Sequence, residues 1–241
     1  MSGATPEGAR TEQEAARWVR GMFGRIAPRY DLANHLLSGN LDRLWRRHTV
    51  KRLAHILDRP GARVLDICCG TGDLAIALQK RSRSRILASD FCHPMLVAAH
   101  RKIPGGVLFE SDALRLPVRD ASLDLITVAF GFRNLANYEA GLREMRRVLR
   151  PGGVAAILEF SQPRNGLFAT VYGYYSRRIL PLIGGVITGA GDAYRYLPES
   201  IQKFPDAPGL AHQMRAAGFE RVTFEYLTGG AVALHSGQII S

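Results

Sequence analysis

A glycine-rich turn followed by a carboxylate is the part of this chain most able to do chemistry. The turn lies in residues 64–73, Val-Leu-Asp-Ile-Cys-Cys-Gly-Thr-Gly-Asp, and Asp90 ends the next apolar run. Gly70 and Gly72 let the backbone approach a ligand closely, because neither carries a Cβ. A helix that begins here offers free N–H groups to an anion, and an acidic residue about 20 positions on can accept two ribose hydroxyls. These features predict a site for an adenosine-containing cofactor.

The elements that must position this site alternate between strands and helices. Strands are expected at 63–67, 85–89, 107–110, 123–130 and 154–160, with helices at 74–80, 94–101 and 137–149. This alternation predicts a parallel sheet with helices on both faces. Further on, Asp206 is expected to cap a helix that ends at Gly218, and residues 221–227 and 231–234 to form a final antiparallel pair.

The spacing of the turn differs from that of a dinucleotide site. A dinucleotide site would show G-x-G-x-x-G, whereas this chain has Asp66-x-Cys68-x-Gly70-Thr71-Gly72. This pattern resembles motif I of class I S-adenosylmethionine methyltransferases, with Cys68 in place of the first glycine. Later segments agree with the resemblance: Ser111-Asp112-Ala113, Asp120-x-Ser122-x-Asp124 and the run 147–153, Arg-Val-Leu-Arg-Pro-Gly-Gly. The resemblance implies an α/β, Rossmann-like fold with a seven-stranded sheet.

Composition limits the partners and the number of domains. The chain has 241 residues, 46% of them hydrophobic, which suits one full core. Its formal net charge of +11 indicates an acidic partner such as nucleic acid or anionic lipid, unless the charge serves only solubility. Three clustered cysteines are too few for a disulfide framework, which favours a reducing cytoplasm. They also lack metal-ligand spacing with histidine, so no metal site is expected.

Two additions to the core stand out within one predicted domain, residues 15–241, which follows a disordered start at 1–14. Residues 15–59 carry ten Lys or Arg against three Asp and are expected to form basic helices. Residues 161–205 follow the fifth strand and begin with an aromatic stretch that has no acidic residue up to position 191. Such an insertion lies where a mobile substrate lid would lie, although it could simply cover the core.

The chain as a whole resembles the ubiquinone/menaquinone C-methyltransferase family, over residues 20–238. The resemblance rests on Met22-Phe23-x-x-Ile26-Ala27-x-x-Tyr30-Asp31-x-x-Asn34, Phe130-Gly131-Phe132-Arg133-Asn134, Leu158-Glu159-Phe160-Ser161-x-Pro163 and Tyr194-x-Tyr196-Leu197-Pro198. It implies methylation of a ring carbon of a polyprenylated quinol with S-adenosylmethionine. The paired cysteines favour demethylmenaquinol, and a methoxy-polyprenyl-benzoquinol remains the alternative.

The resemblance also implies where the protein works. A prenyl tail needs an apolar groove at a membrane surface, which residues 161–191 could supply. Arg43, Arg46 and Arg47 of the basic segment are expected to contact anionic lipid, where each cation contributes about 1 kcal/mol. We therefore expect a cytoplasmic protein held peripherally on the inner face of the membrane, without nucleic acid, and we leave a homodimer open.

The resemblance also implies which residues form the site. Asp90 is expected to bind the ribose, Asp112 and Ala113 the adenine. The methionine end is assigned to the motif I turn and the end of the fourth strand: Asp66, Gly70, Thr71, Gly72, Asp73 and Ala129. Arg133 and Asn134 follow that strand, and Arg133 is expected to stabilise the quinolate or order a water. Tyr30 and Asp31 are expected to close over the site, and His235 is a rival base.

Three other readings stay open. The acceptor could be another lipid-like small molecule on the same fold. A nucleic-acid methyltransferase would explain the charge, but residues 129–134 lack the Asp/Asn-Pro-Pro-aromatic turn of base-amino methylases, and no basic–aromatic stacking platform is visible. A non-catalytic basic module would not need the full set of cofactor motifs.

Overall fold

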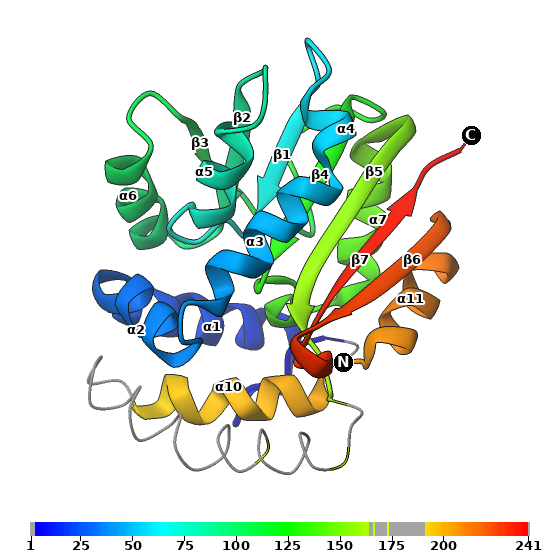
Figure 1. Ribbon diagram of the computed structural model, residues 1–241. Coiled ribbons are helices and arrows are strands. Elements are labelled where there is room, and N and C mark those ends of the chain that lie inside the picture. Colours follow the sequence, from blue (N-terminus) through cyan, green and yellow to red (C-terminus); the bar gives the residue numbers. More distant parts are fainter. Residues whose placement is uncertain (1–2, 164–165, 167–172, 174–190, 241) are drawn as a thin grey trace.

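A seven-stranded sheet forms the centre of the computed structural model, which describes residues 3–163, 166, 173 and 191–240. The strand order is β3-β2-β1-β4-β5-β7-β6 (Figure 1). The first five pair in parallel, and β7 pairs antiparallel with both β5 and β6. The strands are β1 (Val64–Ile67), β2 (Ile86–Asp90), β3 (Val107–Glu110), β4 (Leu123–Ala129), β5 (Leu149–Phe160), β6 (Glu220–Leu227) and β7 (Val232–Gln238).

Alternating side chains of the central strands bury both faces of the sheet. Leu65 and Ile67 of β1 pack with α7 (Tyr138–Val148) and α11 (Ala207–Ala216) on one face. Val64 packs on the other face with α4 (Ala54–Leu57) and α5 (Asp73–Gln79). Because side chains alternate along a strand, this two-sided burial fixes the register. Register in turn brings the carboxyl ends of β1, β2 and β4 to one edge, where ligands of open α/β sheets bind.

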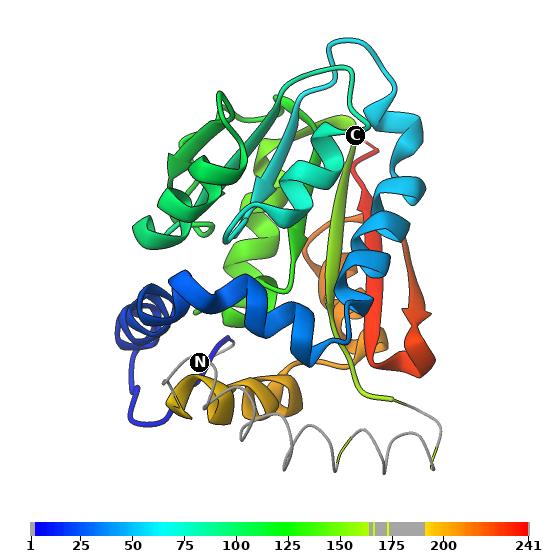
Figure 2. The same ribbon diagram turned by 60° about the vertical axis from the view of Figure 1, so that its left-hand side comes forward.

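A layer of helices covers that edge. It consists of α1 (Glu12–Ile26), α2 (Tyr30–Leu37), the start of α3 (Leu41–Arg52) and α10 (Gly191–Lys203). Figures 1 and 2 both place α1, α2 and α10 beyond the ends of the parallel strands. Buried Val19, Met22 and Ile26 of α1 form one cluster with Cys92 and Met95 at the start of α6 (His93–Lys102). This packing roofs the site with residues that lie far from motif I in sequence.

The predicted order of elements is confirmed, with boundaries that differ by a few residues. The largest difference is β5, which begins at Leu149 rather than at residue 154, because Leu149 pairs with Leu123 of β4. Asn137 and Asp206 cap their helices as expected, each accepting a backbone N–H three residues on. A short 3-10 helix, η2 (Phe132–Asn134), follows β4, and η1 (Ala27–Arg29) and η4 (Thr228–Gly230) are similar single turns.

The start of the chain differs from the expected disorder over residues 3–14. Ala4 is 4% exposed, and its N–H donates to the carbonyl oxygen of Leu135 at 2.8 Å. Thr11 caps α1 in a reciprocal capping box with Glu14, which satisfies two backbone N–H groups. The signal was present in sequence as Thr-x-x-Glu before an apolar run.

Part of the predicted lid lies outside the described residues. Of residues 161–205, the structure describes 161–163, 166, 173 and the segment from α10 onward. Among all described residues, no helix combines the length and the apolar character needed to cross a bilayer.

Candidate active site

A cavity of about 390 Å³ opens at the carboxyl ends of β1, β2 and β4, and we call it the strand-end cavity. Residues from the motif I turn, from the end of β2, from the segment after β3 and from α1 line it. The predicted cofactor residues that line it are Asp66, Gly70, Thr71, Asp73, Asp90, Asp112, Ala113 and Ala129. The fold therefore brings together all but one of the positions that sequence assigned to the cofactor.

Asp90 ends β2 and is held rigidly by the backbone around it. Its Oδ2 accepts the N–H of Gly70 at 2.8 Å, and its Oδ1 accepts the N–H of Cys92 at 2.9 Å. Burial, to 6% exposure, raises the pKa of this carboxyl, while the backbone N–H donors act in the opposite direction. A carboxylate offers about four acceptor sites, so each oxygen can still accept a hydroxyl from the cavity.

The motif I turn separates the roles of its two glycines. Gly70 has φ +55° and lines the cavity, and the atom nearest to a Cβ there would be Cε1 of Tyr30 at 3.8 Å. Gly72 has φ +86° but does not line the cavity. A Cβ on Gly72 would meet Cδ1 of Ile103 at 2.8 Å. Gly72 is therefore needed for the turn and for close packing against the end of α6, and its contact with the cofactor stays a prediction.

Asp66 lies under the cavity at the end of β1. Its Oδ1 accepts the hydroxyl of Thr127 at 2.7 Å, and its Oδ2 has no hydrogen-bond partner among the described residues. Burial raises the pKa of this carboxyl to about 7. Asp66 therefore changes charge near neutral pH, at a wall that the cofactor would contact.

A second cavity of about 430 Å³ lies under the helical layer, and we call it the helix-lined cavity. Its wall is mostly apolar and draws on α1, α2, α3 and α10. Trp45, Phe130 and Phe160 form an aromatic cluster in it, with ring centroids 4.9–6.5 Å apart. The indole N–H of Trp45 donates to Oγ1 of Thr228 at 2.8 Å, which fixes the plane of this ring.

The two cavities share a wall. Phe23, Tyr30, Arg46, Phe130 and Asn134 line both of them. Asn134 is 8% exposed, and neither its amide nitrogen nor its amide oxygen has a partner among the described residues. A buried unsatisfied amide is costly, so a ligand atom at this wall would relieve it. Two of the predicted catalytic residues, Tyr30 and Asn134, thus lie where the two cavities meet.

Arg133 lines only the helix-lined cavity and is held in place by contacts within the protein. Its Nη1 donates to Oε1 of Glu159 at 2.9 Å and to the carbonyl oxygen of Phe130 at 2.6 Å, and its guanidinium lies 5.1 Å from the Phe160 ring centroid. Burial acts to lower the pKa of Arg133, but Glu159, Tyr30 and Tyr196 together raise that pKa above its ordinary value. Arg133 is thus a buried, permanently charged group beside the helix-lined cavity.

Two predicted catalytic groups have other roles. Asp31 lines neither cavity; it accepts the hydroxyl of Thr71 at 2.5 Å and an N–H of Lys102 at 2.8 Å. It therefore ties α2 to the motif I turn. His235 lies in β7 at 2% exposure, away from both cavities, with Nε2 2.9 Å from the carbonyl oxygen of Ala207. Burial lowers the pKa of His235, and its place outside both cavities argues against the role of rival base.

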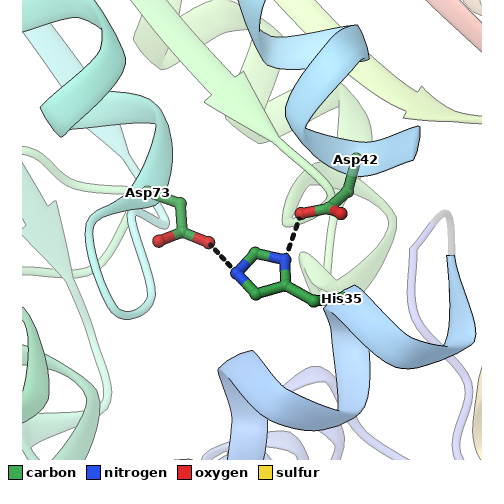
Figure 3. A group of neighbouring side chains, drawn as sticks. All are labelled: His35, Asp42 and Asp73. Atoms are coloured by element: carbon green, nitrogen blue, oxygen red, sulfur yellow. Dashed lines mark hydrogen bonds and ion pairs between the residues drawn. The ribbon is translucent and has the colours of Figure 1, made fainter. Parts of the chain in front are cut away.

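Charged side chains join the helical layer to the motif I turn. Figure 3 shows His35 of α2 between Asp42 of α3 and Asp73 of α5, with ring nitrogens 2.8 Å and 3.9 Å from their carboxylate oxygens. Arg46 pairs with both of these aspartates, and Lys102 pairs with Asp73 at 2.5 Å. Three ligand atoms of His35, Asp42 and Asp73 lie close enough to hold a cation. Since cations of the protein already pair with both carboxylates, the group is an ion-pair network.

Known proteins resemble this chain in sequence and in fold. The model of the ubiE/COQ5 methyltransferase family matches residues 10–239. The chain belongs to this family. A demethylmenaquinone methyltransferase of Thermus thermophilus is 48% identical over 90% of this chain and 99% of its own length. A ubiquinone/menaquinone biosynthesis C-methyltransferase of Azotobacter vinelandii is 45% identical over 94% of this chain and 91% of its own.

Solved structures agree on the fold of this family member. An S-adenosylmethionine-dependent methyltransferase of Thermotoga maritima, described as a possible histamine N-methyltransferase, superposes with a TM-score of 0.66 at 19% identity. It covers 91% of this chain and 99% of its own. A [4+2]-cyclase superposes with a TM-score of 0.67 at 17% identity over 99% of both chains. Because a cyclase shares the fold, the family match and the site, rather than the fold, identify an S-adenosylmethionine-dependent methyltransferase.

Sequence reasoning missed several residues of the site. Glu159 lies in the motif Leu158-Glu159-Phe160-Ser161, but the spacing of that motif does not reveal that Glu159 pairs with Arg133. Arg46 was grouped with surface cations, although it is 8% exposed, while Arg43 and Arg47 are exposed. The expectation that all three contact lipid is therefore wrong for Arg46. A signal existed: Arg46 follows Trp45 on the same helix, and positions 42, 45, 46 and 49 form one buried stripe.

Proposed function

We propose that this methyltransferase transfers the sulfonium methyl of S-adenosylmethionine to a ring carbon of demethylmenaquinol. The observation that carries the proposal is the pair of adjoining cavities. The strand-end cavity has the polar groups that an adenosine and an amino acid need, and the helix-lined cavity has an aromatic, apolar wall. Methyl transfer requires the donor and the acceptor carbon side by side, and the shared wall would provide that arrangement.

The acceptor chemistry assigns a role to each polar group at the helix-lined cavity. A quinol ring carbon becomes nucleophilic when the adjacent hydroxyl loses its proton; the carbon then forms its new bond and releases its own proton. Arg133 would favour the quinolate electrostatically, with Glu159 and the carbonyl of Phe130 holding it in place. Asn134 would hydrogen-bond the hydroxyl at the shared wall. Burial raises the pKa of Tyr30, so Tyr30 would act there as a neutral donor.

The surface around α2 and α3 supports access from a bilayer. Leu32, Leu36 and Leu44 are 62%, 58% and 55% exposed, and Leu36 also lines the helix-lined cavity. Exposed Arg43 and Arg47 lie on the neighbouring face of α3. Apolar side chains flanked by cations suit an anionic lipid surface. The ring of the acceptor could then enter the cavity while the prenyl tail stays in lipid.

The proposal is tested by the identity of the methylated product. Purified protein with labelled S-adenosylmethionine should methylate a reduced, short-chain demethylmenaquinone and leave the oxidised quinone unchanged, because only the quinol can form the nucleophilic anion. Mass spectrometry should place the methyl group on the ring carbon. Methylation of oxygen, or equal rates with oxidised and reduced acceptor, would contradict the proposed chemistry.

A benzoquinol acceptor is the second candidate, because family relatives at 45% identity carry names that include ubiquinone. The proteins named demethylmenaquinone methyltransferase reach 48% and 46% identity, which supports the naphthoquinol. A competition assay with equal concentrations of demethylmenaquinol and 2-methoxy-6-polyprenyl-1,4-benzoquinol decides between them. We expect the naphthoquinol to be consumed first, and the reverse order would assign the protein to the ubiquinone branch.

A further inference from the structure

Arg46 holds a position that the roles above do not explain. It lies on α3, is 8% exposed, and is the one arginine among the described residues that lines both cavities. The neighbouring Arg43 and Arg47 are exposed on the same helix. Burying a guanidinium is expensive unless its charge and its donors are matched, so this placement calls for a partner.

Only some of the N–H donors of Arg46 have partners among the described residues. A guanidinium has five N–H donors. Nη1 donates to Asp42 one turn earlier on the helix, and Nη2 lies 3.6 Å from a carboxylate oxygen of Asp73, an ion pair beyond hydrogen-bond length. Nε is buried and has no partner among the described residues. The guanidinium also lies 5.7 Å from the ring centroid of Phe130. Donors therefore remain for a ligand at the shared wall.

The strand-end cavity shows which end of a ligand Arg46 would meet. Three arginines line that cavity: Arg17, Arg20 and Arg46. Arg20 lies over the ring of Phe91, 5.2 Å from its centroid, next to the ribose-binding position Asp90. Arg46 forms an ion pair with Asp73, the last residue of the motif I turn. An adenosine placed at Asp90 and Asp112 would direct its amino-acid end toward Arg46.

We propose that Arg46 binds the α-carboxylate of S-adenosylmethionine. This proposal rests on the cofactor occupying the strand-end cavity. Asp42 would act as a positioning residue, since it holds Nη1 and leaves the other nitrogens directed elsewhere. Lys102 would assist indirectly: it pairs with Asp73 at 2.5 Å and with Asp31 at 2.8 Å, so Asp73 does not consume the charge of Arg46.

Calorimetric titration with two ligands tests the proposal directly. S-adenosylhomocysteine carries the carboxylate, and its decarboxylated analogue differs only in lacking it. Arg46→Met should weaken S-adenosylhomocysteine about 10- to 100-fold, the range for losing a charged hydrogen-bonded pair. The same variant should leave the decarboxylated analogue nearly unaffected, whereas wild type should discriminate strongly between the two ligands. Arg46→Lys should restore part of the discrimination, because it keeps the charge.

Two further variants separate binding from folding. Lys51→Met removes an exposed cation from the same helix and should change neither affinity. Arg46→Met combined with Asp42→Asn avoids a buried unpaired carboxylate. This double variant should still fail to discriminate between the two ligands, and its thermal stability should be near that of wild type. Equal losses for both ligands would assign Arg46 a purely structural role. Unchanged affinities with a fall in turnover that high pH reverses would instead place the quinolate at Arg46. Either result would overturn the proposal without affecting the proposed acceptor.

Discussion

The strand-end cavity is lined mainly by residues that follow neighbouring parallel strands, whereas the helix-lined cavity is lined mostly by side chains from the helical layer. In the first, sheet register sets the geometry: Asp66 pairs with Ala88 across β1 and β2, and Asp90 with Glu110 across β2 and β3. In the second, single long-range contacts set it, such as Trp45 with Thr228 and Arg133 with Glu159. Under the proposed function, this fold would bind the cofactor with its sheet and select the acceptor with its added helices.

If this division holds, variants on the two sides should fail in different ways. Those at the strand-end cavity should lose affinity for the cofactor, and those at the helix-lined cavity should lose turnover or acceptor affinity. Residues of the shared wall should affect both.

The largest effect is expected at Arg133, on the acceptor side. Arg133→Met should be combined with Glu159→Gln, because removing one partner of a buried pair leaves a costly unpaired charge. Turnover should fall about 10²-fold or more, the scale for losing one group that stabilises developing negative charge. Cofactor affinity should stay nearly intact, and raising the pH should restore part of the rate, because the quinol then ionises without help.

Single-turnover assays with reduced short-chain demethylmenaquinone measure this effect. Glu159→Gln alone serves as the matched control, since it keeps Arg133 and removes only the negative charge that pairs with it. Wild-type turnover in the double variant, or loss of cofactor binding instead of rate, would break the division between the cavities.

The next largest effect is expected at Asp90, on the cofactor side. Asp90→Ala should weaken S-adenosylmethionine about 10- to 100-fold, the range for a charged acceptor of hydroxyl groups. Asp90 also accepts the N–H groups of Gly70 and Cys92, so thermal unfolding must be measured alongside calorimetry. Asp120→Ala, an exposed aspartate outside both cavities, should leave affinity unchanged. A folded Asp90 variant with normal affinity would remove this residue from the site.

The same division explains what sequence could predict. The strands, the capping residues Asn137 and Asp206, and almost all cofactor positions follow from local patterns, because motif I and the strand ends are contiguous in sequence. Gly72 differs from them, because a glycine in the sequence does not say whether its missing Cβ would face a ligand or, as here, Ile103.

The acceptor side was predicted less well for a physical reason. Glu159 and Arg133, which form an ion pair, are 26 residues apart in sequence. Trp45 and Thr228, which form a hydrogen bond, are 183 residues apart. Neither hydrophobic periodicity nor helix-capping residues indicate such long-range pairs. Asp31 resembled a catalytic carboxylate for the same reason, since only the folded chain shows Lys102 and Thr71 beside it. One local signal did exist: the helical spacing of the buried residues of α3 distinguishes Arg46 from the exposed arginines beside it.

A smaller effect is expected at the proposed membrane face. Arg43→Glu with Arg47→Glu should lower partition onto anionic vesicles about 30-fold, because each of the two lost cations contributes about 1 kcal/mol near a charged surface. Added salt should weaken wild-type binding in the same assay. Lys51→Glu, at the other end of α3, should have less effect, and cofactor affinity should not change in either variant. Equal sedimentation of the wild-type protein with neutral and anionic vesicles would contradict a basic lipid face.

The smallest effect is expected at Asp66, and it depends on pH. Burial raises the pKa of this carboxyl from its ordinary value of 3.8 to about 7. Between these values the folded chain holds a proton that the unfolded chain releases. Stability from this group is therefore complete in acid and is lost as the pH rises through about 7.

Cofactor binding should reverse this trend, because a sulfonium cation in the strand-end cavity favours the ionised carboxylate. Affinity for S-adenosylmethionine should rise about 3-fold between pH 6 and pH 8, a few tenths of a pKa unit in free energy. The neutral S-adenosylhomocysteine should show a weaker dependence, and Asp66→Asn should show none for either ligand. Calorimetry in two buffers of different ionisation enthalpy counts the proton released. A wild-type affinity that does not vary with pH, or an equal dependence for both ligands, would show that Asp66 supports β1 through Thr127 without sensing the charge of the cofactor.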